Sequence, residues 1–329
     1  MTDGLRVSVA LCTFNGARFV RQQVESILAQ RPGPAQLVVS DDGSRDDTLE
    51  IVRDVAGSQR AAAVEVVVLA GEQPVGVTRN FQRAVTAADG DLIALSDQDD
   101  VWHEGRLERI AARFADDPAL LLVHTDADLV DSTGRRLGRT LFESLEISPD
   151  EFAAEESGRA FDAFIRRNLA TGATVVFRRE LLMAALPFPD GWVHDEWLAA
   201  VAAATGRVDV LREATIDYRQ HESNQIGVAA PSLRGKIKRV LEPRGSRNTV
   251  LAERFATLAD RLAGLGDAVA REKLDMAREK ARFEAERAAF PTNRARRALP
   301  VLRLASSGRY ERFASRGRGD VVRDLLQPA

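Results

Sequence analysis

The chain is poor in cysteine, in aromatic residues and in long apolar runs. Its 329 residues include one cysteine, Cys12, and 6% aromatic residues. A single thiol excludes an internal disulfide and any metal site built from several thiolates, and we expect Cys12 to be a small buried residue of the first strand. The longest apolar stretches, such as residues 61–70, fall well short of the ~20 residues that span a bilayer, so we predict no transmembrane helix.

The N-terminus also lacks a basic segment followed by an apolar one. We therefore expect no secretion signal and a cytoplasmic location. A further absence concerns the loop after the first apolar run, which contains no G-x-G-x-x-G string. This argues against a dinucleotide-dependent oxidoreductase.

Charge is divided unevenly along the chain. Residues 1–230 contain 23 Arg and Lys against 37 Asp and Glu, whereas residues 231–329 contain 23 against 12. A basic extension on an acidic body can approach anionic lipids, nucleic acid or the body itself. Its last segment interleaves Leu and Phe with Arg294, Arg296, Arg297, Arg303, Arg309, Arg312, Arg316 and Arg318. This pattern suits docking to an anionic membrane, and a solvated basic face is the alternative.

Short β-branched runs alternate with helical patterns in the first half of the chain, which is typical of an α/β fold. The predicted strands, buried and mostly parallel, are Val7–Leu11, Gln36–Ser40, Val64–Leu69 and Asp91–Ser96. Helical spacing of apolar residues between and after them is found at Val20, Val24, Ile27 and Leu28, at Phe81, Ala84 and Val85, and at Leu107, Ile110 and Phe114. Ser44 and Asp47 form a capping-box pattern that predicts a helix start after a turn at Gly43.

The pattern loosens after Asp126, where we predict strands over residues 173–179 and 214–219. Beyond Pro231, apolar residues recur at heptad-like intervals at Leu251, Phe255, Leu258, Leu262 and Leu265. This spacing predicts a helical hairpin or bundle. The chain is thus expected to have three parts, 1–125, 126–230 and 231–329.

Two acidic turns follow predicted strands. Residues Ser96–Asp100 (SDQDD) bring three carboxylates to the carboxyl end of a strand, which is the ligand-binding edge of open α/β sheets. Clustered carboxylates repel one another unless a cation lies between them, and oxygen ligands favour Mg²⁺ or Mn²⁺. The alternative is an acidic turn that caps the next helix.

In Ser40–Ser44 (SDDGS), Asp41 or Asp42 can accept hydrogen bonds from a nucleobase and a ribose, although D-D-G is also a common turn.

Seven segments, in order, resemble family-two glycosyltransferases of the GT-A fold. They are VALCTFNGARFVRQQVESILAQ, VVSDDGSRDDT, GVTRNFQRA, GDLIALSDQDDVW, GATVVFRRELL, HDEW and YRQHESNQIG, and they span about 70% of the chain. The strings DQDDVW, HDEW and YRQH are most similar to bacterial rhamnosyltransferase-like enzymes of surface polysaccharide synthesis. The resemblance implies a Rossmann-like, mixed and mainly parallel sheet flanked by helices, with a C-terminal helical extension. Residues 1–125 would bind the nucleotide sugar, and residues 126–230 would bind the acceptor and supply the catalytic base.

The resemblance also implies roles for individual residues. The donor would contact Thr13, Asn15, Asp41, Asp42, Arg79, Asn80 and Asp97. Asp97 and Asp99 form the D-x-D element for Mg²⁺ or Mn²⁺, with Asp99 as the direct metal ligand. His221 can ligate the cation or donate to a phosphate oxygen, and a structural histidine is the alternative.

Asp195 in HDEW matches the family's catalytic base, although the family more often has Glu at the position of His194. A sugar hydroxyl is a poor nucleophile, so a carboxylate within about 3 Å must take its proton. In-line attack would invert the anomeric centre. The acceptor is expected to contact Gly172, Trp192, Glu196 and Trp197. An exposed Trp192 indole would stack on a sugar, whereas core packing is the alternative for both tryptophans.

The resemblance therefore implies transfer of a single sugar, with dTDP-rhamnose as the suspected donor and a glycan or lipid-linked saccharide as the acceptor. No nucleic acid is expected as a partner. The string YRQH stands where processive relatives have Q-x-x-R-W, which favours transfer of one or a few sugars. The alternative function is an inactive homologue that binds nucleotide sugar and acts as a scaffold in polysaccharide assembly.

Overall fold

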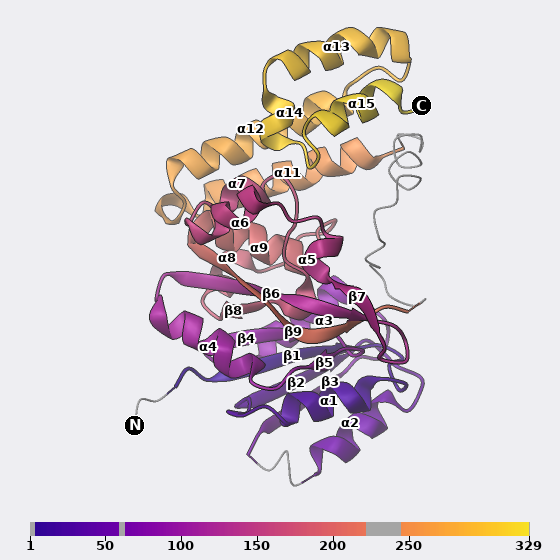
Figure 1. Ribbon diagram of the computed structural model, residues 1–329, viewed down its shortest axis with the longest axis vertical. Coiled ribbons are helices and arrows are strands. Elements are labelled where there is room, and N and C mark those ends of the chain that lie inside the picture. The colour runs from indigo at the N-terminus through magenta and orange to yellow at the C-terminus, as the bar shows by residue number, and fades with distance from the viewer. Residues whose placement is uncertain (1–3, 59–62, 222–244, 329) are drawn as a thin grey trace.

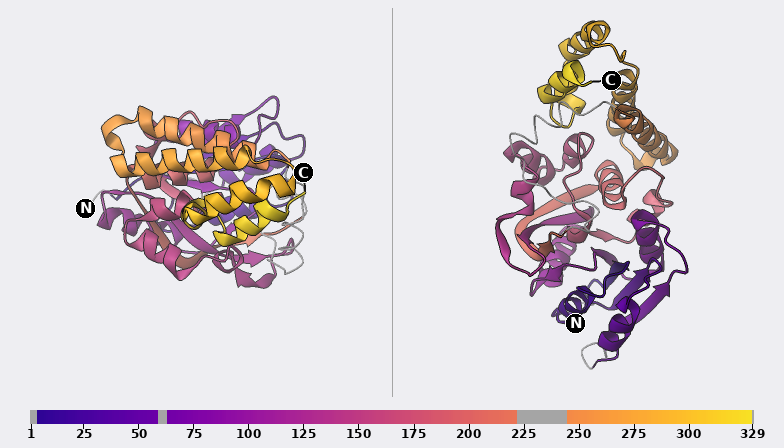
Figure 2. Two further views of the ribbon diagram at one scale, coloured as in Figure 1. Left: turned by 90° about the horizontal axis from the view of Figure 1, so that it is seen from above. Right: turned by 90° about the vertical axis from the view of Figure 1, so that its right-hand side faces the viewer.

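The structure is a computed structural model that describes residues 4–58, 63–221 and 245–328 (Figure 1). One twisted sheet is covered by helices on both faces, and a group of C-terminal helices lies over one side of the molecule (Figures 1 and 2). This is the α/β arrangement with a helical extension that the sequence predicts. Among the described residues, no helix is both long and apolar enough to cross a membrane.

The sheet has nine strands in the order β3-β2-β1-β4-β8-β6-β9-β5, and β7 pairs with β6. Their bounds are β1 (Val7–Thr13), β2 (Gln36–Asp41), β3 (Glu65–Ala70), β4 (Leu92–Ser96), β5 (Val101–Trp102), β6 (Leu120–Val130), β7 (Arg136–Thr140), β8 (Val176–Arg178) and β9 (Arg207–Arg219). The pairs β1–β2, β1–β4, β2–β3 and β6–β9 are parallel. Strand β8 is antiparallel to both β4 and β6 and joins the two parallel groups. The mixed, mainly parallel sheet is therefore confirmed.

Helices cover the two faces of this sheet. Those of the first part of the chain are α1 (Val20–Leu28), α2 (Thr48–Ala56), α3 (Val77–Ala87), α4 (Arg106–Asp116), α5 (Leu141–Ser144), α6 (Pro149–Glu156), α7 (Ala160–Phe164), α8 (Leu181–Ala185) and α9 (His194–Thr205). The apolar stripes predicted on α1, α3 and α4 are buried. One apolar core joins α1, α2 and α4 to the sheet, and another joins α3, α7 and α9. Burial of these stripes is what holds the helices to the sheet.

Three local predictions differ from the structure. Asp47 occupies the N-cap position of α2, which begins at Thr48, but no side chain makes a capping hydrogen bond there, so the predicted capping box does not form. The Ser44 hydroxyl donates instead to Asp41 and accepts from the amide of Asn15 (2.8 Å). These two hydrogen bonds keep the hydroxyl from capping the helix. The strand predicted over residues 173–179 is shortened to β8, because residues 172–174 form a 3₁₀ turn. The segment 214–219 is only the end of the longer strand β9.

The C-terminal region contains α11 (Arg247–Gly264), α12 (Arg271–Ala288), α13 (Arg294–Ser306), α14 (Arg309–Phe313) and α15 (Arg318–Leu326). Helices α11 and α12 form the predicted hairpin, and α11 packs against the α/β part through Phe255, whose ring lies edge-on to Trp192 at 5.6 Å. Strand β6 crosses residue 125, and the division of the chain into three parts stays a prediction.

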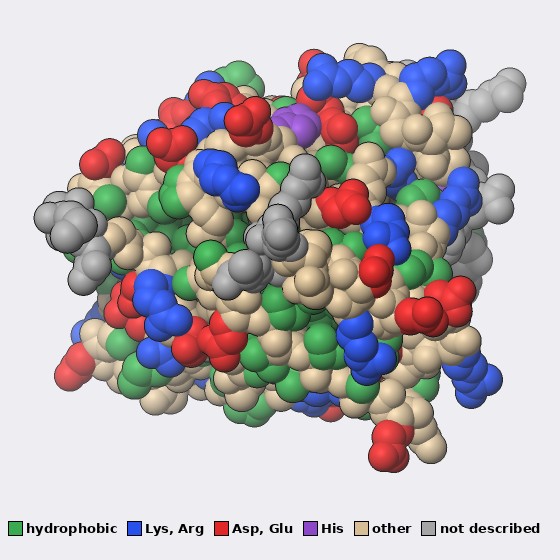
Figure 3. All heavy atoms as spheres, turned by 90° about the horizontal axis from the view of Figure 1, so that it is seen from below, with side chains coloured by type: hydrophobic (Ala, Val, Ile, Leu, Met, Phe, Trp, Pro, Cys, Tyr) green, Lys and Arg blue, Asp and Glu red, His purple; other side chains and the backbone are tan. Residues whose placement is uncertain are grey.

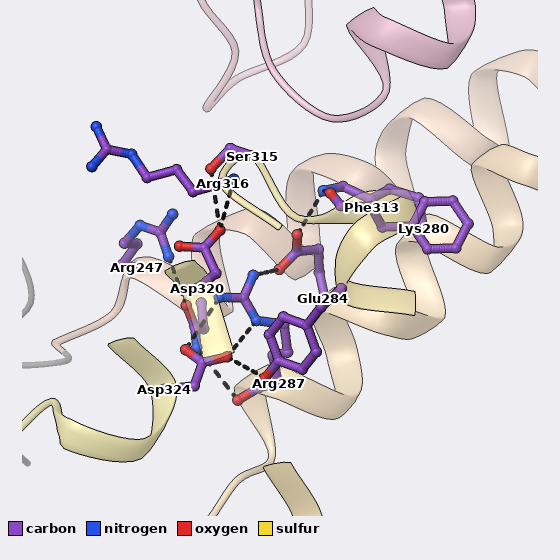
Figure 4. A network of polar contacts seen from close by, with 11 residues as sticks. Arg247, Lys280, Glu284, Arg287, Phe313, Ser315, Arg316, Asp320 and Asp324 are labelled. Atoms are coloured by element: carbon purple, nitrogen blue, oxygen red, sulfur yellow. Dashed lines mark hydrogen bonds and ion pairs between the residues drawn. The ribbon is translucent and has the colours of Figure 1, made fainter. Parts of the chain in front are cut away.

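A buried group of charges joins α12, α14 and α15 (Figure 4). Arg287 lies 2.9 Å from Glu284 and 2.7 Å from Asp324, and Lys280 lies 2.7 Å from Glu284. The Tyr310 hydroxyl donates to Asp324 at 2.6 Å. Because charges removed from water are tolerated only when they are paired, these contacts fix how α15 sits on α12.

Candidate active site

Three parallel strands end at one edge of the sheet. Thr13 at the end of β1 is in register with Asp41 at the end of β2, and Leu11 of β1 is in register with Ser96 at the end of β4. The loops that follow these strands therefore start side by side, because parallel strands present their carboxyl ends at the same edge. The structure brings the two acidic turns together as the sequence predicts.

These loops are tied to one another by side chains. Gln98 accepts from the amide of Phe14 (2.8 Å) and donates to its carbonyl (3.1 Å). A Cβ at Gly16 would lie 2.1 Å from Gln98 Oε1, so a larger residue there would displace the Gln98 side chain from these bonds. The amide of Asn15 donates to Ser44 Oγ at 2.8 Å. The loops after β1, β2 and β4 thus form one connected unit.

Asp41 and Asp42 use their carboxylates to shape this edge. Asp41 accepts from Thr13 Oγ1 (2.7 Å) and from the amides two and three residues later. Asp42 accepts from the amides of Val75 and Gly76 at 2.8 and 2.9 Å. Both aspartates are buried. A nucleobase bound by Asp42 would have to share these bonds, so its role in base recognition stays a prediction.

Arg79 and Asn80 lie on α3 beside this edge. The Asn80 amide donates to the Ser40 carbonyl (2.8 Å), and its oxygen accepts from Ser40 Oγ (2.7 Å). Arg79 forms an ion pair with Asp190 at 2.7 Å. Asn80 thus supports the end of β2 from within, and Arg79 connects α3 to the loop before α9. Their predicted contact with the donor is not tested by these bonds.

The acidic turn after β4 and the predicted base act on each other electrostatically. Burial, followed by the negative charges of Asp99 and Asp195, raises the pKa of Asp97 to about 7. Charges influence one another in this way only when they are near and poorly screened. The D-x-D element and Asp195 therefore face the same region of the molecule, although about 100 residues of chain separate them.

Asp195 lies in the first turn of α9 and is held by backbone amides. Its Oδ2 accepts from Gly172 at 2.8 Å and its Oδ1 from Glu196 at 2.6 Å. Burial nevertheless raises the pKa of Asp195 to about 7, against the effect of these hydrogen bonds. A carboxylate with a pKa near neutrality is suited to accept a proton and release it again.

His194 forms an uncharged neighbour of this base. Its ring stacks on Phe81 with centroids 3.8 Å apart, and neither ring nitrogen has a hydrogen-bond partner among the described residues. Burial lowers the pKa of His194 to about 3. Gly172 leaves room for this ring, because a Cβ there would lie 3.0 Å from His194 Nε2. The histidine that replaces the family's usual glutamate therefore adds bulk but no charge beside Asp195.

The end of β9 brings His221 to the acidic turn. His221 Nε2 lies 2.6 Å from Asp99 Oδ2, and the Phe19 ring stacks on the imidazole at 5.0 Å. Arg219 anchors this end, since its amide donates to Asp100 (3.0 Å) and its Nε donates to the Asp99 carbonyl (2.7 Å). The pair of His221 and Asp99 offers one nitrogen and one oxygen ligand of the kinds that Mn²⁺ accepts, while the described residues place no third ligand atom within 4.8 Å of both. The rest of the YRQHESNQIG string, residues 222–227, lies outside the described residues.

Two further residues of this region were not selected from the sequence. Tyr218 is buried, and its phenol pKa is raised by burial and by the charges of Asp97, Asp100, Asp99 and Asp195. Phe14 is 44% exposed at the end of β1. The sequence signal for Tyr218 was its place in YRQH, three residues before the selected histidine.

The side chains predicted to contact the acceptor are buried or already paired. Trp192 is only 4% exposed, and its indole N–H donates to the Arg254 carbonyl at 3.1 Å. Trp197 is fully buried and donates to the Ala185 carbonyl at 2.7 Å. The prediction of an exposed Trp192 indole is wrong, because α11 covers this ring, and core packing holds for both tryptophans. Glu196 is paired with Arg254.

A second group of potential metal ligands lies on the same sheet. Ligand atoms of His103, Asp128 and Asp217 are within 4.8 Å of one another. His103 Nε2 already contacts Asp217 at 2.9 Å, its other ring nitrogen contacts the Ala214 carbonyl at 3.2 Å, and Asp128 is paired with Arg136. These partners account for the cluster as an ion-pair network of β6 and β9.

Comparison with known proteins identifies the family of this arrangement. Residues 8–184 match the model described as glycosyl transferase family 2, which is more than half of the chain. The chain belongs to glycosyl transferase family 2. The match begins in β1, contains the D-x-D element and ends within α8, ahead of Asp195.

Relatives of this family 2 chain include named glycosyltransferases. An uncharacterized glycosyltransferase of Nostoc sp. is 25% identical over 67% of this chain and 66% of its own length. The dTDP-rhamnosyl transferase RfbG of Shigella flexneri is 27% identical over 70% of this chain and 78% of its own length.

Solved structures show the same fold. A portion of Staphylococcus aureus TarS in complex with UDP-GlcNAc has a TM-score of 0.55 at 17% identity, over 98% of this chain and 90% of that one. The mannosyltransferase PcManGT of Pyrobaculum calidifontis, in complex with GDP-Man and Mn²⁺, has a TM-score of 0.51 at 20% identity, over 99% and 86% of the two chains. The GT-A fold class is thereby confirmed.

Proposed function

We propose that this family 2 chain transfers one sugar from a nucleotide diphosphate donor to a hydroxyl group of an acceptor glycan, with inversion at the anomeric carbon. The observation that carries the proposal is the glycosyl transferase family 2 match over residues 8–184, and the charges of Asp99 and Asp195, which both act on Asp97, support it. A metal-binding element and a lone proton acceptor at one edge of an α/β sheet meet the needs of glycosyl transfer.

Asp195 acts as the general base in this proposal. Hydrogen bonds from two backbone amides hold its carboxylate in place. Its pKa of about 7 lets it take the proton of the acceptor hydroxyl near neutral pH. Asp195 is only 8% exposed and its neighbour His194 is uncharged, so little water reaches the carboxylate. Lower access of water strengthens the interaction between the base and the acceptor hydroxyl.

Asp99, Asp97 and His221 would hold Mg²⁺ or Mn²⁺. The residues present fit such a cation, because burial and the charges of Asp99 and Asp195 raise the pKa of Asp97 and a positive charge would offset both effects, and because the neighbouring Asp100 Oδ2 is buried without a partner among the described residues. When bound, the cation stabilises the negative charge that the diphosphate gains as it leaves.

The donor proposed is dTDP-rhamnose, and its support is the named activity of the 27% identical Shigella relative. UDP and GDP sugars are the competing donors, as the complexes of the two structural neighbours illustrate. The exposed ring of Phe14, next to Thr13 and Asn15, offers a face on which a base can stack. The proposed setting is the cytoplasm, at the inner face of the membrane, with a lipid-linked saccharide as the acceptor.

Two measurements test this function. Calorimetric titration with dTDP, UDP and GDP in the presence of Mn²⁺ should give binding for one nucleotide, and EDTA should weaken it. Incubation with the matching nucleotide sugar should release nucleoside diphosphate when an acceptor is present. An inactive scaffold would bind the nucleotide sugar but release no product, and failure to bind any nucleotide with Mn²⁺ would refute both functions.

A further inference from the structure

The solvent side of α13 and α15 exposes large aliphatic side chains. Leu299 and Leu302 of α13 are 56% and 54% exposed, and Val322 and Leu326 of α15 are 48% and 49% exposed. The two helices pack against each other at the end of the molecule opposite α1 and α2 (Figures 1 and 2). Two adjacent helices thus expose four large aliphatic side chains that the rest of the described chain does not cover.

Both helices turn these residues away from α12. On α13, Val301 and Leu304 are buried in one cluster with Phe283 of α12. On α15, Asp324 is buried against Arg287 of α12. Since residues on opposite sides of a helix point in opposite directions, the exposed aliphatic side chains of α13 and α15 face outward together.

Arginines without acidic partners border this patch. Arg296 and Arg303 are exposed on α13 among the aliphatic residues, and neither is paired with a carboxylate in the described part of the chain. The side chain of Arg316, just before α15, extends away from the buried charges (Figure 4). We call Arg296, Leu299, Leu302, Arg303, Val322 and Leu326 the α13–α15 surface.

Most of the arginines that the sequence suggests for docking are bonded to other residues of the C-terminal helices. Arg309, Arg312 and Arg318 are each paired with a glutamate. Arg297 is buried and donates to the Gln327 carbonyl at 2.6 Å. Arg294 also donates to the Gln327 carbonyl, at 3.4 Å. Five of the eight arginines that the sequence suggests for docking are thus bonded within the C-terminal helices.

We propose that the α13–α15 surface docks on an anionic lipid bilayer. Aliphatic side chains at this position can enter the boundary between headgroups and acyl chains, while guanidinium groups beside them bind anionic headgroups. A symmetric contact of this surface with a second copy would bring its arginines together, and the surface offers no carboxylate to pair them. Nucleic acid would leave the four aliphatic side chains without an apolar partner. This inference concerns binding and stands apart from the sugar that is transferred.

The opposite end of the molecule has a different distribution of charged side chains. There, acidic and basic side chains are interspersed over the visible face (Figure 3). Such a mixed face has little net attraction for an anionic surface, because opposite charges cancel over a few ångströms. Docking is therefore expected to be oriented, with α13 and α15 toward the lipid.

Flotation of the full chain with vesicles tests the proposal. Vesicles of equal parts phosphatidylcholine and phosphatidylglycerol should carry the protein to the top of the gradient, and vesicles of phosphatidylcholine alone should not. The variant R296A/R303A should partition about 30-fold less, because each arginine near an anionic surface contributes roughly a factor of five. The variant L299S/L302S should also lose binding, at low salt as well as high salt, since it removes the apolar contribution.

The matched control is M183S/R271A, which removes one exposed apolar residue and one exposed arginine elsewhere (88% and 94% exposed, the latter for the side chain). It should float like the unaltered chain. Thermal melting confirms that all variants are folded. Three outcomes would overturn the proposal: no flotation of the full chain with the anionic vesicles, unaltered flotation of both surface variants, or a dimer in light scattering that L299S/L302S abolishes while vesicles bind nothing.

Discussion

The pH dependence of turnover is the sharpest test of Asp195 as the base. Its pKa of about 7 means that roughly one tenth of the carboxyl groups are ionised at about pH 6, half at about pH 7 and nine tenths at about pH 8. If only the ionised form accepts the acceptor proton, kcat should rise about tenfold from about pH 6 to about pH 8. Saturating Mn²⁺ keeps Asp97 ionised, so that the rise reports Asp195.

Replacement of the base gives the second half of this test. Asp195→Asn keeps the size of the side chain but removes the proton acceptor, so kcat should fall about 100- to 10,000-fold while nucleotide affinity stays within about threefold. Asp116→Asn, an exposed aspartate at the end of α4, is the matched control and should keep full activity. A flat pH profile, or a variant that keeps more than about a tenth of the activity, would remove Asp195 from the mechanism.

The same pKa shift predicts an effect on stability. A carboxyl group whose folded pKa is raised binds its proton more tightly in the folded state, so its contribution is present below the unfolded pKa of about 3.9 and is lost as the pH rises through about 7. The loss amounts to at most about 4 kcal/mol for Asp195. The unaltered chain should therefore lose more stability than D195N between about pH 5 and about pH 8 in urea unfolding. Equal losses in the two proteins would contradict the buried, shifted carboxyl group.

Three other predictions follow from the site and the C-terminal helices. Asp99→Asn should abolish the Mn²⁺-dependent rise in melting temperature measured with nucleoside diphosphate, and a rise as large as that of the unaltered chain would exclude Asp99 as a ligand. Gly172→Ala should lower kcat about tenfold or more with little change in melting temperature, because the new Cβ presses on the ring beside Asp195; full activity would show that this packing does not position the base. Arg287→Met should cost about 3–5 kcal/mol in urea unfolding, because Asp324 is left buried without its cation, and a cost below about 1 kcal/mol would show that the pair is not needed.

Much of the fold could be predicted because it follows from short-range patterns. The strands β1, β2 and β4 are continuous apolar runs, and the buried residues of α1, such as Val20 and Val24, repeat at helical spacing. The acidic turns could be placed at one edge because parallel strands end together. No short-range pattern predicts that β9 pairs with β6, because the two strands are about 90 residues apart in sequence. In the sheet, this parallel pair also follows the antiparallel strand β8.

The site was less predictable where its geometry depends on contacts between distant loops. Asp42 is engaged by the amides of Val75 and Gly76, which no local pattern could indicate. Tyr218 faces the carboxylates only because β9 returns to the acidic turn. Trp192 looked like a loop residue in PFPDGW, and its burial depends on α11, which is more than 50 residues away in sequence. Local sequence therefore indicates which residues lie near the site, but not which of them are buried by elements distant in sequence.

Arg254 connects the two ends of the enzyme. Its carbonyl accepts from Trp192, its guanidinium lies 4.3 Å from the centre of that indole ring, and it pairs with Glu196, the residue next to Asp195. The platform beneath the catalytic helix is thus partly built from α11. Truncation before α11 would expose the Trp192 ring and leave Glu196 without its cation in the first turn of α9. A shortened chain would therefore test the packing around Asp195 as well as the role of the C-terminal helices.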